Sequence, residues 1–64
     1  MKVNGKQMDK KDLKTISDLL EKLNVNKNRV VVELNREIIK VEDFDEILLN
    51  HEDSIEIIAF VGGG

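Results

Sequence analysis

The chain has 64 residues, a length that allows one domain with a modest hydrophobic core. It holds no cysteine, which excludes disulfides, thiolate nucleophiles and thiolate metal sites and suits a reducing compartment. The net charge is −3, divided into +4 over residues 1–40 and −7 over residues 41–64. With two aromatic residues and an acidic second half, a nucleic-acid partner is disfavoured. The acidic half could attract a basic groove on a partner protein, or could be a solvated surface.

The first segment, MKVNGKQMDK, contains no apolar run long enough for a signal peptide or a membrane span, so we expect a cytoplasmic protein. Within it, Asn4-Gly5 favours a type I′ turn, because both residue types accept positive φ. The resulting hairpin pairs Val3 with Lys6. The residues on its apolar face are Met1, Val3 and Met8.

A helix is predicted over the segment TISDLLEKL, residues 15–23. Thr15 and Asp18 have the spacing of a capping box, and Asn24 can take the left-handed conformation that ends a helix. A helix this short is not stable alone, so it must lie on another element. Its apolar stripe has the i, i+3, i+4, i+7 spacing and consists of Ile16, Leu19, Leu20 and Leu23.

Strands are predicted at residues 29–34, 37–40 and 54–60, with a turn at Asn35-Arg36 in which arginine stands where glycine is favoured. Side chains alternate between the two faces of a strand. One face carries Val30, Val32, Leu34, Ile55, Ile57 and Ala59, and the opposite face carries Val31, Glu33, Glu56, Ile58 and Phe60. The segment 41–53 is expected to be irregular, with anchors at Val41, Phe44, Ile47 and Leu48.

The element order is therefore hairpin, helix, hairpin, irregular segment and strand. A single helix can cover only one face of the sheet, and the last strand fits in the centre, parallel to the first. This predicts an α+β protein of the ubiquitin-like β-grasp type, with a mixed five-stranded sheet and one main helix across one face.

Few residues could support catalysis. His51 is the only histidine and lies in a polar loop, where a solvated side chain is far more common than a general base. The acidic cluster at residues 42–46 lacks the alternation and the glycine of a calcium-binding loop. We therefore predict a protein that is not an enzyme, with no intrinsic catalytic residue, no metal site and no bound cofactor.

The face of the sheet opposite the helix is more informative. Val31, Ile58 and Phe60 are apolar residues on this face, which suggests a docking surface. Scattered surface apolar residues are the alternative.

Residues 61–64, VGGG, follow the last strand. Glycine has no Cβ, so such a segment can pass through a narrow channel, and four residues beyond Phe60 can reach about 14 Å. The terminal carboxylate has no neighbouring side chain to hinder it. We divide the chain into a domain at 1–60 and a flexible tail at 61–64; an idle terminus or a remnant of cloning are the alternatives.

The chain resembles the ThiS family of bacterial sulfur carrier proteins over nearly its whole length. The resemblance is carried by the segments VNGK (3–6), TISDLL (15–20), RVVVELNREII (29–39) and DSIEIIAFVGGG (53–64). Arg36 departs from the glycine common at this turn in the family, which affects turn strain and not the chemistry.

The resemblance implies that other proteins act on the chain. A ThiF-type adenylyltransferase would use ATP, bound by that enzyme, to activate the Gly64 carboxylate. Sulfur from a donor of the cysteine desulfurase type would displace AMP, and a ThiG-type thiazole synthase would take it from the resulting thiocarboxylate. Gly62 and Gly63 would thread into the partner's active site, and the chain would be a monomer when free. The expected docking patch is Val31, Ile58, Phe60 and Val61.

Two alternatives remain open from the sequence. One is a related carrier for molybdopterin synthesis or tRNA thiolation, although the short length and the VGGG ending favour the thiamin branch. The other is a ubiquitin-like interaction module whose tail is inert.

Overall fold

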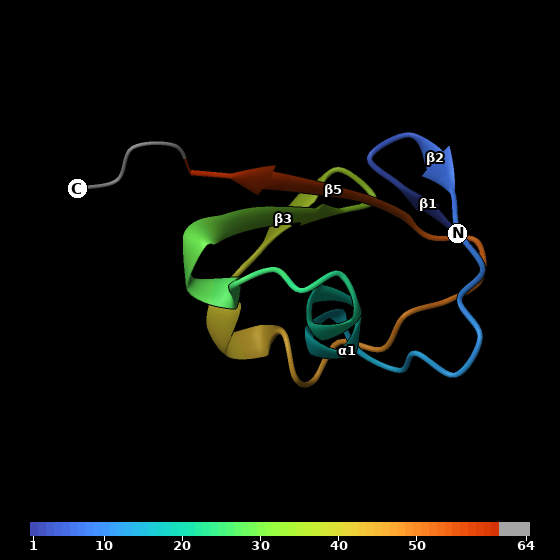
Figure 1. The fold of residues 1–64 in the computed structure, drawn as a ribbon, viewed down its shortest axis with the longest axis horizontal. Coiled ribbons are helices and arrows are strands. Elements are labelled where there is room, and N and C mark those ends of the chain that lie inside the picture. Colours follow the sequence, from blue (N-terminus) through green and yellow to red (C-terminus); the bar gives the residue numbers. More distant parts are fainter. Residues whose placement is uncertain (61–64) are drawn as a thin grey trace.

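In the computed structural model, which describes residues 1–60, five strands form one mixed sheet and a helix lies across one of its faces (Figure 1). The strand order is β2-β1-β5-β3-β4. The central strand β5 runs parallel to β1 and antiparallel to β3, which confirms the predicted β-grasp arrangement. The elements are β1 (Lys2–Val3), β2 (Lys6–Gln7), α1 (Ile16–Lys22), β3 (Val30–Leu34), β4 (Glu37–Ile39) and β5 (Ser54–Ala59), with 3₁₀ turns at Lys27–Arg29 and Val41–Asp43.

The first hairpin has the predicted turn and register. Val3 pairs with Lys6, and the turn residues Asn4 and Gly5 have φ of 52° and 81°. Both values are positive, as a type I′ turn requires. The side chain of Asn4 also accepts a hydrogen bond from the Ile57 N–H at 2.7 Å, so this turn is tied directly to β5.

The second hairpin uses the same turn without glycine. Asn35 and Arg36 have φ of 51° and 74°, so arginine occupies a left-handed conformation that strains most side chains. Asn35 holds the turn against β5, because its Oδ1 accepts from the Ser54 N–H at 3.0 Å and its Nδ2 donates to Asp53 at 3.0 Å. The turn therefore depends on contacts beyond its own hairpin.

Local sequence signals set both ends of α1. Thr15 and Asp18 form the predicted capping box, with reciprocal bonds of 3.2 Å. At the other end Asn24 has a φ of 58°, and the Val25 N–H donates to the Leu20 carbonyl at 2.9 Å, as in a Schellman motif. The helix spans seven residues, and within residues 1–60 we find no helix long and apolar enough to cross a membrane.

The hydrophobic core lies between α1 and the inner face of the sheet. Leu48 and Val41 were expected to anchor the segment before β5, but they are 67% and 43% exposed, so this prediction is wrong. The other two expected anchors are confirmed, since Phe44 is buried and Ile47 packs against the core, and Leu49 is buried in place of Leu48. Leu48 forms a bridge with Thr15, and this extended geometry turns Leu49 inward and Leu48 outward. The buried core residues are Met1, Val3, Ile16, Leu19, Leu20, Val30, Val32, Phe44, Leu49 and Ile55.

The two turns allow a matched test of backbone strain. Gly5 and Arg36 occupy the same position in equivalent turns, and a Cβ added at Gly5 meets nothing within 4 Å. We expect Arg36→Gly to stabilise the protein by about 0.5–1 kcal/mol and Gly5→Ala to destabilise it by about 1 kcal/mol. Urea unfolding of both variants measures these changes. A loss of stability in Arg36→Gly would show that the arginine side chain contributes more than its backbone strain costs.

The capping box predicts a pH dependence of stability. The backbone N–H groups of Lys14 and Thr15 donate to the Asp18 carboxylate and lower its pKa from the ordinary value of 3.8. Because the folded pKa is the lower one, this stabilisation is complete above 3.8 and is lost as the pH falls through the folded value.

Below pH 4, the denaturant midpoint of unfolding should therefore fall less steeply with decreasing pH for Asp18→Asn than for the wild type. Asp12→Asn is the matched control, since Asp12 is exposed and lies outside the cap. Identical acid profiles for Asp18→Asn and the wild type would contradict the prediction.

Candidate functional site

An apolar patch lies on the outer face of the sheet, opposite α1. Val31 on β3 is the register partner of Ile58 on β5, so two of the predicted docking residues are neighbours. Ile58 is 51% exposed, Phe60 is 57% exposed, and Val31 is half-buried. We call Val31, Ile38, Ile58 and Phe60 the outer patch.

Ile38 is the member of the outer patch that the sequence interpretation missed. It is 70% exposed, and its register partner on β3 is Glu33, which places it on the outer face. The signal was present in the chain: a two-residue turn at Asn35-Arg36 pairs Leu34 with Glu37 and therefore Glu33 with Ile38.

The position of Phe60 is set by one hydrogen bond beyond the end of β5. The strand ends at Ala59, one residue earlier than predicted, but the Phe60 N–H still donates to the Arg29 carbonyl at 2.9 Å. The chain is therefore held in line with the sheet up to Phe60. Val61, Gly62, Gly63 and Gly64 lie outside the described residues, and their roles remain predictions.

The outer face is supported by the core packed against the inner side of β5. Ile55 is fully buried and Ile57 is half-buried against the core, so alternate residues of β5 hold the strand while Ile58 projects outward. β5 also pairs with β3 from Ile55 to Ala59 and with β1 at Ser54 and Ile55. The same face carries two acids, Glu33 and Glu56, directly opposite each other.

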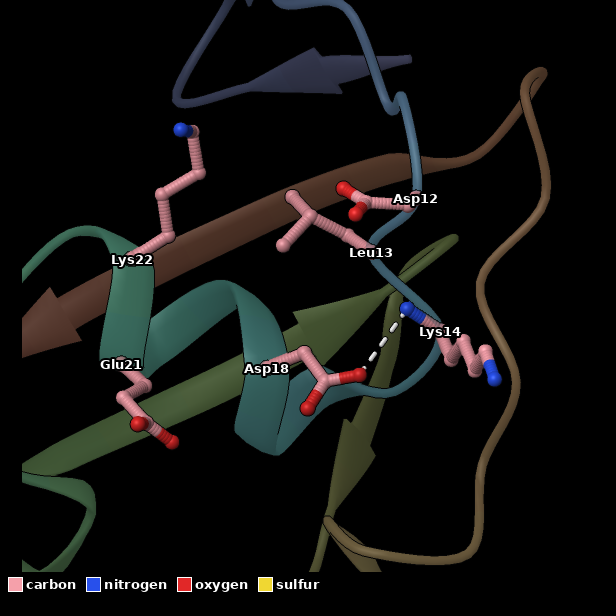
Figure 2. Close-up of a pocket in the computed structure, with 6 residues that line it drawn as sticks. All are labelled: Asp12, Leu13, Lys14, Asp18, Glu21 and Lys22. Carbon is pink, nitrogen blue, oxygen red and sulfur yellow. Dashed lines mark hydrogen bonds between the residues drawn. The ribbon is translucent and has the colours of Figure 1, made fainter.

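A surface hollow beside the start of α1 offers less chemistry (Figure 2). Its lining residues are Asp12, Leu13, Lys14, Asp18, Glu21 and Lys22. Figure 2 shows the Asp18 carboxylate bonded to the backbone nitrogen of Lys14, while the ammonium end of Lys14 points away. The lowered pKa of Asp18 is thus explained by helix capping, because backbone N–H groups stabilise its charged form.

The remaining candidates from the sequence are also surface groups. His51 is exposed in the loop before β5, as the sequence indicated. In the acidic segment 42–46, Asp45 accepts a hydrogen bond from the Ser17 hydroxyl, and Phe44 is buried. Across residues 1–60, no three His, Cys, Asp or Glu side chains are grouped to hold a metal ion.

Comparisons with known proteins agree with this geometry. The model of the ThiS family matches residues 1–64. The sulfur carrier protein ThiS of Bacillus subtilis is 46% identical over 65 residues, covering 100% of this chain and 98% of that protein. A crystal structure of the thiamine biosynthesis protein ThiS from Geobacter metallireducens is 35% identical, with a TM-score of 0.81, over 98% of this chain and 96% of that one.

A second kind of relative is a thiazole synthase of Paramagnetospirillum magneticum. It is 36% identical over 62 residues, which are 97% of this chain but only 19% of the relative. A segment similar to nearly the whole of this chain is therefore part of a much longer enzyme. With its matching length, fold and sequence, the chain belongs to the ThiS family, whose members are sulfur carriers of thiamine biosynthesis and not themselves catalysts.

Proposed function

We propose that the Gly64 carboxylate is the group of this carrier that receives and delivers sulfur. The observation that carries the proposal is the position of the strand before residues 61–64. β5 is fixed in the centre of the sheet, and the Phe60 N–H is still hydrogen-bonded to the Arg29 carbonyl where the described residues end. On this proposal, residues 1–60 are the folded domain and residues 61–64, which follow Phe60 in the sequence, are its reactive tail. Gly62 and Gly63 would let the tail enter a narrow active site.

The chemistry requires activation, because a carboxylate is a poor acceptor for a nucleophile. A ThiF-type adenylyltransferase would join the Gly64 carboxylate to the α-phosphate of ATP with loss of pyrophosphate. The terminal sulfur of a persulfide, supplied through a cysteine desulfurase, then displaces AMP and forms an acyl disulfide. A thiol cleaves the S–S bond of this intermediate, which leaves the thiocarboxylate on Gly64 and a new disulfide on the donor side. ATP is bound by the activating enzyme, and the carrier is proposed to act in the cytoplasm.

A ThiG-type thiazole synthase is the proposed acceptor of the sulfur. The similarity of this chain to a segment of the Paramagnetospirillum magneticum thiazole synthase supports this partner, since the two functions then share one polypeptide. As the sulfur is transferred, an oxygen atom from water or from the sulfur acceptor takes its place on the Gly64 carbonyl carbon, so the carboxylate is regenerated and the carrier can be used again. The free carrier is proposed to be a monomer that docks through the outer patch and Val61.

Intact mass spectrometry tests the site of sulfur attachment. After incubation with the activating enzyme, ATP and a sulfur donor, we expect the wild type to gain the mass of one oxygen-to-sulfur exchange, located at Gly64. Deletion of Gly63 and Gly64 should abolish the gain. The circular dichroism of the deletion variant should be unchanged, because residues 1–60 contain all the described sheet and core contacts. Sulfur at any other residue would contradict the proposal.

Phe60→Asp tests the docking surface. The Phe60 side chain is 57% exposed, so the substitution should leave folding intact, but it should weaken binding to the partner enzymes by about 2–4 kcal/mol if the ring is a central anchor. Leu48→Asp is a matched control, because Leu48 is similarly exposed, at 67%, and lies outside the sheet. Calorimetric titration with each enzyme measures the change. Equal affinities for the two variants would remove Phe60 from the docking surface.

A further inference from the structure

Two acidic residues lie directly opposite each other on the outer face, where like charges lower the stability of the sheet. Glu33 on β3 and Glu56 on β5 are register partners in the antiparallel ladder. Both lie on the face away from α1, because their neighbours Val32 and Ile55 are buried on the inner face. Directly opposed side chains have Cβ atoms about 4.5–5.5 Å apart, and like charges there are destabilising. The fold alone gives no reason for this pair.

The outer patch borders the acidic pair. Glu33 also pairs with Ile38 on β4, and the next outward residues along the strands are Val31 and Ile58. Glu33 is itself half-buried, so a protein covering the patch would also cover its carboxylate. Lys2, the basic residue of β1 on this face, lies opposite Ser54 and not opposite Glu56.

We infer that Glu33 and Glu56 together receive one cationic side chain, an arginine or a lysine, from the thiazole synthase that docks on the outer patch. This inference rests on the proposed function and specifies the chemistry of its docking surface. A single cation placed between the two carboxylates removes their repulsion and forms charge-assisted hydrogen bonds with both. The planar guanidinium of arginine suits two acceptors best.

The arrangement also explains how affinity and selectivity are divided on this face. Apolar contact at Ile38, Ile58 and Phe60 supplies buried area, which any apolar surface could match. The acidic pair adds a requirement for positive charge at one point, and an apolar or acidic partner surface would leave the carboxylates covered and unpaired. The partner surface that fits is therefore an apolar one with a cation at its border.

Glu33→Gln and Glu56→Gln test the inference in the 64-residue carrier. Each should reduce affinity for the thiazole synthase about tenfold or more and should weaken the dependence of the association rate on salt. Each should also raise the melting temperature by about 1–5 °C, because the repulsion between the pair is relieved. A loss of binding together with a gain in stability cannot result from unfolding.

Glu52→Gln is the matched control, since it removes the same charge from an exposed loop residue away from the outer patch. Its affinity should stay close to that of the wild type.

In the double variant, the loss of affinity should be smaller than the product of the two single losses, because one cation serves both carboxylates. If the two losses of affinity multiply, each carboxylate makes a separate contact, and the inference of one shared cation is wrong.

The inference is overturned if both single variants bind the synthase as tightly as Glu52→Gln does. The proposed function is measured separately, by the oxygen-to-sulfur mass change at Gly64. A wild type that gains sulfur, with variants that bind normally, contradicts only the acidic-pair inference. A wild type that gains no sulfur contradicts the proposed function, and absence of wild-type binding to the synthase contradicts both.

Discussion

The structure depends on the way polar side chains fix the central strand β5 at its start. Asp53, which is only 7% exposed, accepts hydrogen bonds from Asn35 Nδ2 at 3.0 Å and from the Asn50 N–H at 2.8 Å, while its carbonyl accepts from the Lys2 N–H at 2.9 Å. A buried carboxylate must be satisfied in this way, because an unpaired one would be strongly destabilising. The asparagines of the two type I′ turns then bond to the backbone of β5. Turn residues from both hairpins thus set the register of one strand.

That register determines what the outer face presents. With Ile55 buried, alternation directs Glu56 and Ile58 outward, and pairing with β3 brings them beside Glu33 and Val31. A slip of one residue would bury the acids and expose the core residues. The outer patch and the buried core are therefore two consequences of the same strand alignment, and neither could change without the other.

Sequence patterns predicted the features that depend on local chemistry. The capping box of α1 and the turn at Asn4-Gly5 involve neighbours in the chain, and the alternation in β3 and β5 predicted the exposure of Ile58. Features that depend on distant contacts were harder. Whether Leu48 or Leu49 points inward is decided by pairing with residues 14 and 15, and the opposition of two acids follows from the β3–β5 register. Residues 61–64 are the part of the candidate site that the structure does not describe.

The flanking of β5 by a parallel and an antiparallel neighbour has a mechanical consequence. A pull on the chain beyond Phe60 acts along the axis of β5, and the hydrogen bonds of both ladders lie roughly across that axis. The bonds to β3, at residues 55–59, and the bonds to β1, at Ser54 and Ile55, then bear the load together in shear, instead of breaking one at a time as they would if the strand were peeled from an edge. A force applied to the chain beyond Phe60 by a bound enzyme would therefore be resisted by the sheet, and the domain would stay folded.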